Sequence, residues 1–341
     1  MKQRGLFDEI ERLEDLTKLG DPLIVLTEKI KWETFRPILS QIRVENPENI
    51  NNAGRKPFDE VMMFRVIILQ SLYGLSDDQM EFQLKDRRSF ERFVSGGEIK
   101  CQMPDAKTIW LYKERFKEHG IARKVFRKFN QQLDKANLMA KSGQIIDASF
   151  VEVPRQRNNR DENKHIKTEG TCPEEWSDNK KKQKDVDARW TEKNRQKHFG
   201  YKNHIAADKK RKFIINYEVT SAEVHDSQPF FDVLGKARKK NEPVWGDSAY
   251  RSEDNEKKLV KKGFISKIHE KGYRGRPLTE KQKANNTIKS RTRARVEHIF
   301  GSIYWFKGKY LRCIGLARIT EAVGMINVAY NMKRYCRIAS Y

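Results

Sequence analysis

The sequence predicts an α/β protein in which a mixed sheet with flanking helices follows an all-helical N-terminal domain. Apolar residues recur at helical spacing up to about residue 140, and short apolar runs rich in Ile, Val, Phe and Tyr begin at Gly143. We therefore expect a helical domain over residues 1–140 and an α/β domain over residues 141–341. A chain of 341 residues is long enough for each domain to bury its own core.

Three helices are predicted in the N-terminal part. Pro57 is expected at the first helical position of one helix, and Gly74 ends it. Ser76 and Gln79 have the spacing of a capping box that opens a second helix, and Asp105 is expected to cap a third. Two helices joined by a short turn fit either a DNA-binding helix-turn-helix or an ordinary helical bundle. The apolar face of the second helix comprises Met80, Leu84, Phe90 and Phe93, and that of the third comprises Ile109, Tyr112 and Phe116.

Strands are predicted in the second part, with helical runs after Ala222 and Tyr250. A hairpin is expected to turn at residues 208–211, which makes the sheet mixed. Residues 155–197 are dense in charged side chains with little periodicity, and we expect a long, solvated excursion between two strands. The predicted strands are QIIDASFVEV, FGYKNHIAAD, KFIINYEVTSA, PVWGDSAY and GFISKI.

The net charge of +23 is concentrated in the second part of the chain. Residues 1–140 carry 25 basic and 22 acidic side chains, whereas residues 141–341 carry 45 and 25. The last 61 residues carry 13 basic side chains against two glutamates. Such a surface favours nucleic acid as the partner, because binding releases the counterions of the phosphates. A solvated basic surface without a partner is the alternative.

The sequence also indicates the cellular compartment. The N-terminus lacks the basic start and apolar stretch of a secretory signal, and no apolar run approaches the roughly 18 residues that cross a bilayer. We expect a cytoplasmic, nucleoid-associated protein without a membrane segment. The four cysteines are far apart and lack zinc-finger spacing, so neither disulfides nor a structural zinc is expected; they are Cys101, Cys172, Cys313 and Cys336.

Three carboxylates are the candidate catalytic residues. Asp147 follows an apolar run at the expected end of one strand, Asp247 follows another, and Glu297 lies on a predicted helix one turn after Arg293. Singly, each has a structural alternative: a turn or cap for the aspartates, and an ion pair with Arg293 for Glu297. As an ordered set they suit two Mg²⁺ ions roughly 3.5–4 Å apart, which can activate the attacking oxygen and stabilise the leaving oxygen of phosphodiester transfer. Mn²⁺ is an acceptable substitute.

The blocks IIDASFVEVP, VWGDSAYRS and RARVEHIFG resemble, in that order, the catalytic blocks of DDE transposases of bacterial insertion sequences, which have an RNase H-like catalytic domain. The resemblance extends through MPDAKTIWLYKERFKEHG, GYKNHIAAD and VHDSQ, from about Phe58 to Tyr330. It implies that Asp147, Asp247 and Glu297 are the metal ligands. It also implies that water frees 3′-hydroxyls at the ends of the element and that these hydroxyls attack target DNA.

The same resemblance suggests the partners. Double-stranded DNA, as transposon ends and as target, is expected, and a homo-oligomer, most simply a dimer, would hold two ends together. Two rival functions share these features: a non-catalytic DNA-binding repressor derived from a transposase, and an RNase H-like nuclease without strand transfer. The interval of 50 residues from Asp247 to Glu297 leaves little room for the large inserted domain that some relatives carry.

The chain departs from the family pattern around the glutamate. Ser290 stands where the family has Tyr, and Tyr304 stands where it has Lys. We expect Lys307, about one helical turn beyond Tyr304, to supply the missing phosphate contact. The candidate DNA-binding residues are Arg293, Lys307, Lys309, Arg274 and Arg276.

Other polar and aromatic residues have structural interpretations. His225 is expected to act as a cap or strand-end hydrogen-bonding group, and Trp245 as a core residue. Lys202 and His204 are assigned no catalytic role. Three consecutive aromatic residues suit stacking against unpaired DNA ends, but burial of at least two of them is the default expectation. They are Tyr304, Trp305 and Phe306.

Overall fold

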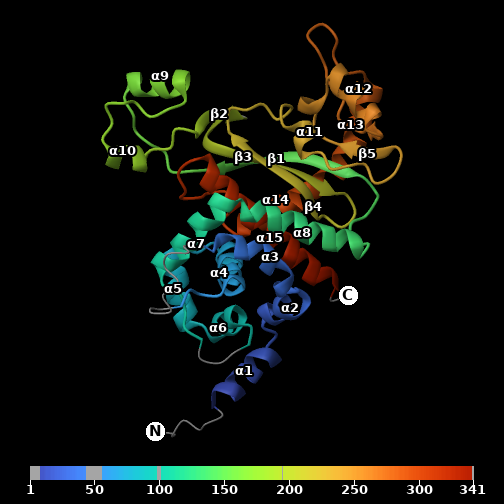
Figure 1. The fold of residues 1–341 in the computed structure, drawn as a ribbon. Helices are drawn as coiled ribbons and strands as arrows, with labels where there is room; N and C mark the ends of the chain where they lie inside the picture. The colour runs from blue at the N-terminus through green and yellow to red at the C-terminus, as the bar shows by residue number, and fades with distance from the viewer. Residues whose placement is uncertain (1–7, 44–55, 98–100, 194, 340–341) are drawn as a thin grey trace. The chain divides into compact units, whose positions relative to one another are not determined.

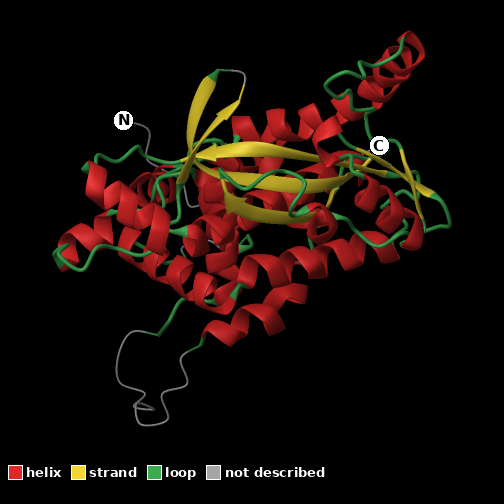
Figure 2. Cartoon of the chain, turned by 90° about the horizontal axis from the view of Figure 1, so that it is seen from above, coloured by secondary structure: helices red, strands yellow, loops and turns green. Residues whose placement is uncertain are grey.

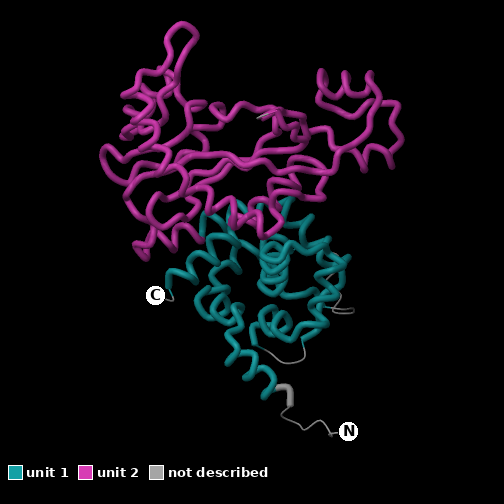
Figure 3. Tube along the Cα trace, turned by 180° about the vertical axis from the view of Figure 1, so that it is seen from behind, with its two compact units in different colours: residues 1–128, 328–341 teal, residues 129–327 magenta. Residues whose placement is uncertain are grey.

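The computed structural model describes residues 8–43, 56–97, 101–193 and 195–339. The chain divides into two compact units, shown in Figure 3. Unit 1 comprises Met1–Lys128 with Val328–Tyr341, and unit 2 comprises Phe129–Asn327. The last residues of the chain thus group with the N-terminal helices. The division into a helical domain over residues 1–140, with a helix-turn-helix or an ordinary bundle as alternatives, and a catalytic domain over residues 141–341 stays a prediction.

The described parts of unit 1 are helical (Figure 1). Met62 N–H donates to the side chain of Asp59, so α4 begins after Asp59 and not at Pro57, and it ends at left-handed Gly74 as predicted. The capping box of Ser76 and Gln79 is present. The elements are α1 (Asp8–Lys18), α2 (Pro22–Lys29), η1 (Trp32–Phe35), α3 (Arg36–Leu39), η2 (Ser40–Ile42), α4 (Glu60–Tyr73), α5 (Asp77–Asp86), α6 (Arg88–Ser95), α7 (Ala106–His119), α8 (Ile121–Lys135) and α15 (Leu316–Ala339), of which α8 and α15 run into unit 2.

The second predicted helix is two helices in the structure. The backbone of Arg87 is extended, and this break separates α5 from α6. Phe90 and Phe93 nevertheless face the core of unit 1, where Trp32 packs edge-on against Phe93 and Phe64 at centroid distances of 5.4 and 5.7 Å. The apolar pattern therefore predicted burial correctly, although it did not reveal the break.

Unit 2 is built on a six-stranded mixed sheet, drawn in yellow in Figure 2. In the order β4-β3-β1, neighbouring strands are antiparallel, and β5 and β6 continue the sheet parallel to β1. This is the RNase H-like arrangement, and it confirms the predicted fold class. The extra strand β2 pairs antiparallel with the start of β3. The strands are β1 (Gln144–Glu152), β2 (Arg189–Lys193), β3 (Gln196–Asp208), β4 (Ile214–Ser221), β5 (Glu242–Trp245) and β6 (Phe264–Ser266).

The rest of unit 2 contains helices and short 3-10 turns. One core cluster joins Ile146 of β1 and Val244 of β5 to Phe230, Tyr250 and Leu259 from the connecting segments. The predicted helical runs after Ala222 and Tyr250 therefore pack against the sheet. The elements are α9 (Arg160–Glu169), α10 (Asp178–Gln183), α11 (Phe230–Val233), η4 (Ser248–Tyr250), α12 (Glu253–Lys261), α13 (Glu280–Arg293), η5 (Ala294–Val296) and α14 (Glu297–Trp305).

The charged excursion between β1 and β3 has more structure than its sequence pattern indicates. It contains α9, α10 and β2 (Figure 1). Trp176 is buried, and its Nε1 donates to Glu162 Oε1 at 2.8 Å. Buried Asp185 accepts hydrogen bonds from the hydroxyl of Tyr201 at 2.7 Å and from the backbone N–H of Gly315 at 3.0 Å. A few specific hydrogen bonds thus hold a segment in which the sequence periodicity predicted no ordered structure.

No helix in the described part of the chain is both long and apolar enough to cross a membrane.

Candidate active site

The register of two parallel strands brings the candidate aspartates together. In the pairing of β1 with β5, Ile145 stands beside Trp245. Asp147 lies two residues further along β1, and Asp247 follows β5 two residues after Trp245. The negative charge of Asp247 is one of the causes that raise the pKa of Asp147, so the two carboxyl groups interact. Asp147 was expected at the end of its strand, but β1 continues past it to Glu152 because this stretch stays paired with β3.

Asp147 is held in an environment that disfavours its charge. Its side chain is only 17% exposed, and this burial, reinforced by the negative charge of Asp247, raises its pKa to about 6. A hydrogen bond from the backbone N–H of Ala148 at 2.9 Å and the charge of Arg293 act in the opposite direction. The guanidinium Nη1 of Arg293 lies 3.5 Å from Asp147 Oδ2. Burial is the larger effect, so a cation beside Asp147 would be stabilising.

Asp247 follows β5 and precedes the 3-10 turn η4. Its Oδ1 accepts a hydrogen bond from the backbone N–H of Ala249 at 2.8 Å. The structural alternative for Asp247, a cap at a turn, is therefore real. The cap uses Oδ1, and it fixes the carboxylate beside Asp147.

A buried tyrosine, Tyr250, ends the 3-10 turn that Asp247 caps. Tyr250 is 1% exposed, and its hydroxyl has no hydrogen-bond partner among the described residues. Burial and the negative charges of Asp147, Asp226 and Asp247 raise its pKa well above the ordinary value. A buried hydroxyl without a partner and three carboxylates whose charges act on it give this edge of the sheet an excess of negative charge.

Glu297 is placed differently from the prediction. Arg293 ends α13, Glu297 begins α14, and the 3-10 turn η5 separates them, so the two residues do not share one continuous helix. Val296, Ile299 and Ile303 are buried, and Phe300 is partly buried. Glu297 itself is exposed at the start of α14. Asp147, Asp247 and Arg293 are thus brought together, and Glu297 is not shown to join them.

The residues present suit a divalent cation only in part. The described residues contain no group of three or more His, Cys, Asp or Glu side chains able to hold a metal ion. A pair of carboxylates is nevertheless compatible with Mg²⁺, which commonly takes one or two protein carboxylates and completes its coordination with water and substrate phosphate. Asp147 and Asp247 together have this composition, and the pKa of Asp147 is raised mainly by its burial and further by the negative charge of Asp247.

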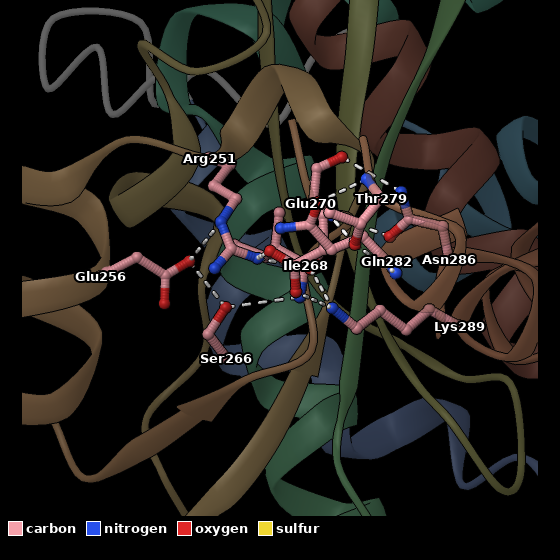
Figure 4. Close-up of polar contacts among 9 residues, drawn as sticks. All are labelled: Arg251, Glu256, Ser266, Ile268, Glu270, Thr279, Gln282, Asn286 and Lys289. Atoms are coloured by element: carbon pink, nitrogen blue, oxygen red, sulfur yellow. Dashed lines mark hydrogen bonds and ion pairs between the residues drawn. The ribbon is translucent and has the colours of Figure 1, made fainter. Parts of the chain in front are cut away.

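A polar network fixes the turn after Asp247 to α13 (Figure 4). Glu270 lies at its centre: Arg251 Nη1 is 2.8 Å from Oε2, and Lys289 Nζ is 2.9 Å from Oε1. The amide of Asn286 donates to the backbone oxygen of Glu270 and accepts from its N–H, at 3.1 and 2.8 Å. These contacts hold the helix that ends in Arg293.

Sequence reasoning missed this network. Arg251 lies within the block VWGDSAYRS, four residues after Asp247, and that position was its only signal. Glu270 and Lys289 are 19 residues apart on a loop and a helix, so no periodicity links them.

Two of the candidate DNA-binding arginines sit on a projecting hairpin. Tyr273 and Arg276 exchange backbone hydrogen bonds of 3.1 and 2.9 Å across Arg274 and Gly275. Gly275 has a φ of 80°, a left-handed conformation that favours glycine. The side chains of Arg274 and Arg276 are exposed on this loop, the orange loop that extends beyond α13 in Figure 1.

The candidate lysines follow α14. The helix ends at Trp305, so the expectation that Lys307 lies one helical turn further is wrong. Lys307 instead has a φ of 56° in the turn that closes the helix, where Gly308 N–H donates to Ile303 O at 2.9 Å. Lys309 is exposed, with its Nζ 5.4 Å from the centre of the Tyr304 ring.

The end of α14 at Trp305 also affects how far the aromatic side chains at this end of the helix are exposed. Trp305 is 81% exposed and Tyr304 is 60% exposed, whereas Phe306 is buried. The expectation that at least two of the three are buried is therefore wrong. The apolar stripe of α14 passes through Ile299 and Ile303, and the two residues after Ile303 point away from it.

The remaining candidates have structural partners. Lys202 Nζ donates to Val224 O and lies 2.8 Å from Asp226 Oδ1. His204 Nε2 is 2.9 Å from Thr220 Oγ1, and burial lowers the pKa of His204 to about 4. His225 interacts with Ser227 two residues away, and Trp245 is buried, as predicted for both.

Comparisons with known proteins identify the family of the chain. The family model described as "Transposase DDE domain" matches residues 139–332, and that described as "Transposase domain (DUF772)" matches residues 11–115. Among solved structures, the chain is similar to piggyBac transposase in a cryo-EM structure of a synaptic complex with hairpin DNA. The TM-score is 0.49 at 14% identity, over 94% of this chain and 75% of that one. The match to the DDE domain covers more than half of the chain and contains both aspartates and Glu297, so the chain belongs to the DDE transposase family.

Proposed function

We propose that this transposase cleaves DNA at the ends of a transposon and joins the freed 3′-hydroxyls to target DNA in a reaction that requires a divalent metal ion. The observation that supports this most directly is the electrostatic interaction of the two aspartates: burial and the negative charge of Asp247 raise the pKa of Asp147 to about 6. Keeping a charged, largely buried Asp147 near a second carboxylate costs stability, and that cost favours a functional role over a purely structural one.

Each residue would have a distinct task. Asp147 and Asp247 would hold the cation, and Glu297 is proposed as the third carboxylate. Two bound Mg²⁺ ions, or Mn²⁺, would supply the positive charge that activates an attacking oxygen and stabilises a leaving one. Arg293, 3.5 Å from Asp147, would balance the remaining negative charge and turn its other donors to the scissile phosphate.

The reaction would proceed in two displacements at phosphorus. In the first, water attacks the phosphodiester at the transposon end, and the 3′-oxygen leaves as a hydroxyl. In the second, that hydroxyl attacks a target phosphodiester, a new bond joins the two DNAs, and the target 3′-oxygen leaves. Both steps need the same in-line arrangement, so one pair of aspartates would serve both.

Binding of DNA would rest on the positive field of the second part of the chain. Residues 141–341 carry 45 basic against 25 acidic side chains, and the exposed cations proposed to contact DNA are Arg274, Arg276, Lys307 and Lys309. Two ends must be joined in one reaction, so we propose a homo-oligomer, most simply a dimer, on DNA.

A cleavage and joining assay tests the proposal against both rivals. The protein is incubated with labelled DNA carrying its own flanking ends, with Mg²⁺ or with chelator, and the triple variant Asp147→Ala, Asp247→Ala, Glu297→Ala is the blank. We expect metal-dependent nicks at the ends followed by joining to a second DNA. Tight binding without cleavage would instead indicate a repressor, and cleavage without joining would indicate a nuclease.

Glu297 needs its own test, because the structure does not gather it with the aspartates. Glu297→Gln should keep DNA binding and lose metal-dependent cleavage. Retained cleavage would remove Glu297 from the proposed set.

A further inference from the structure

The exposed aromatic side chains at the end of α14 are unusual for an amphipathic helix. Trp305 and Tyr304 expose 81% and 60% of their surface, and a large ring left in water costs free energy unless a ligand covers it. Tyr310, 48% exposed, follows on the next segment. Packing in the core therefore does not explain why aromatic residues stand at these three positions.

Tyr304 stands on the same side of α14 as Glu297. Positions i, i+4 and i+7 share one helix face, and here they are Glu297, Gly301 and Tyr304. A side chain at Gly301 would meet no atom within 4 Å, so the surface between the other two is open. At 1.5 Å per residue, Tyr304 lies about 10 Å along the helix axis from Glu297.

The surroundings of this face are strongly basic. Residues 289–312 carry seven Lys and Arg side chains against the single acid Glu297, a net charge of +6. Lys309 places its Nζ 5.4 Å from the Tyr304 ring centre. Lys307 holds a left-handed backbone that a non-glycine residue rarely adopts, as residues at functional sites often do.

The segment behind the rings is anchored. Glu152 N–H donates to Lys309 O at 2.8 Å, and Leu311 N–H donates to Glu152 O at 2.9 Å, so the segment carrying Lys309 and Tyr310 pairs with the end of β1. The strand that holds Asp147 therefore also positions this face. A ligand seated here would have a fixed relation to the active site.

We propose that this face binds unpaired DNA: the rings of Tyr304 and Trp305 stack on bases of a single-stranded DNA end, and Lys307 and Lys309 contact its phosphates. Basic side chains interleaved with exposed aromatic rings are the features that recognise single-stranded nucleic acid without reading sequence. A distance of about 10 Å equals roughly three base steps of DNA at 3.4 Å each, so bases stacked on Tyr304 would lie about three steps from Glu297, the proposed third carboxylate. The inference rests on the proposed function, because it names the DNA form that the same site receives.

The test measures binding without catalysis. Two labelled DNAs are titrated in chelator, one a blunt duplex and the other the same duplex ending in four unpaired nucleotides with 2-aminopurine among them. Wild-type protein should quench the 2-aminopurine on binding. Trp305→Ala and Tyr304→Ala should each weaken binding of the unpaired end by about 5- to 100-fold, the loss expected for one stacked base, and change blunt-duplex binding by less than about 2-fold.

Matched variants distinguish stacking from loss of fold. Tyr304→Phe keeps the ring and should retain binding. Trp190→Ala removes a tryptophan that is 50% exposed on β2 and should leave both affinities unchanged. Gly301→Leu places a side chain on the open strip and should weaken binding of the unpaired end, although no ring is removed.

Several outcomes would overturn the inference. Equal losses on both DNAs, or no loss on either, would exclude base stacking, and a change of oligomeric state in Trp305→Ala without any loss of affinity would make this face a subunit interface. Its failure is distinguishable from failure of the proposed function. A wild-type protein that cleaves and joins DNA while these variants bind normally refutes only the stacking. Selective binding of unpaired ends by a protein that never cleaves refutes only the catalysis.

Discussion

Replacing Asp147 by asparagine should make the protein more stable while removing its activity. The buried carboxyl has a folded-state pKa of about 6 against an ordinary value of 3.8. A difference of roughly two pKa units corresponds to about 3 kcal/mol of destabilisation at neutral pH. The asparagine side chain is neutral and could keep the hydrogen bond from Ala148, but it would give up the ion pair with Arg293. We expect a net gain of about 2 kcal/mol, equivalent to about 4–8 °C in melting temperature.

The pH dependence of this gain follows from the direction of the shift. Above about pH 6 the folded protein carries an ionised, buried Asp147, so the difference between wild type and variant is fully present. As the pH falls from about 6 to 3.8, the folded state takes up the proton first and the difference shrinks. Below that range the carboxyl is protonated in both the folded and the unfolded state, and the two proteins should differ little.

The assay is urea unfolding in chelator at pH 7.5 and at pH 4, followed by a repeat with Mg²⁺. Asp254→Asn, an exposed aspartate in the first turn of α12, is the control and should change stability by no more than about 0.5 kcal/mol. Mg²⁺ should stabilise the wild type and leave Asp147→Asn unchanged. A variant less stable than wild type at pH 7.5 would refute the account of a strained, buried charge.

Three further predictions concern the surroundings of the site. Glu270→Gln should lower the free energy of unfolding by about 1–3 kcal/mol in urea, because two cations lose the carboxylate that joins them; an unchanged value would show that the network is weak. Lys307→Gly should raise stability by about 0.5–1 kcal/mol by relieving the left-handed backbone and yet weaken DNA binding in a filter assay, and a loss of stability would contradict the strain. The double variant Arg274→Ala, Arg276→Ala should reduce the slope of log affinity against log salt by about 0.9 for each phosphate that the two arginines neutralise, and an unchanged slope would place DNA elsewhere.

Local patterns predicted much of the fold. The capping box of Ser76 and Gln79, the glycine that ends α4 and the hairpin after Asp208 all depend on contacts within a few residues, and the structure has each of them. Short apolar runs rich in Ile, Val, Phe and Tyr likewise marked the strands of the sheet. These features follow from local chemistry that the sequence displays directly.

Interactions between distant residues were harder to predict. The ties that order residues 155–197 link Asp185 to Tyr201 and to Gly315, which is 130 residues away in sequence. The Glu270 network likewise joins a loop to a helix. A hydrogen bond between segments this far apart produces no periodic pattern in the sequence. Whether it forms depends on how the fold buries the two groups.

The candidate site shows the same division. The order of Asp147, Asp247 and Glu297 in the sequence indicated a catalytic set, and the two aspartates follow paired residues of β1 and β5 and interact electrostatically. The position of Glu297 depended on whether its helix was continuous. The 3-10 turn at Ala294–Val296 interrupts it, and the side-chain pattern around Val296 gave no sign of that turn.

The most direct test of the central claim is a titration of the metal-free protein with Mn²⁺, followed by electron paramagnetic resonance. The account predicts that the wild type and Asp254→Asn bind Mn²⁺, and that Asp147→Asn and Asp247→Asn each lose the bound ion. Equal Mn²⁺ binding by all four proteins, or none by the wild type, would contradict the claim that the two neighbouring aspartates form the metal site of this transposase.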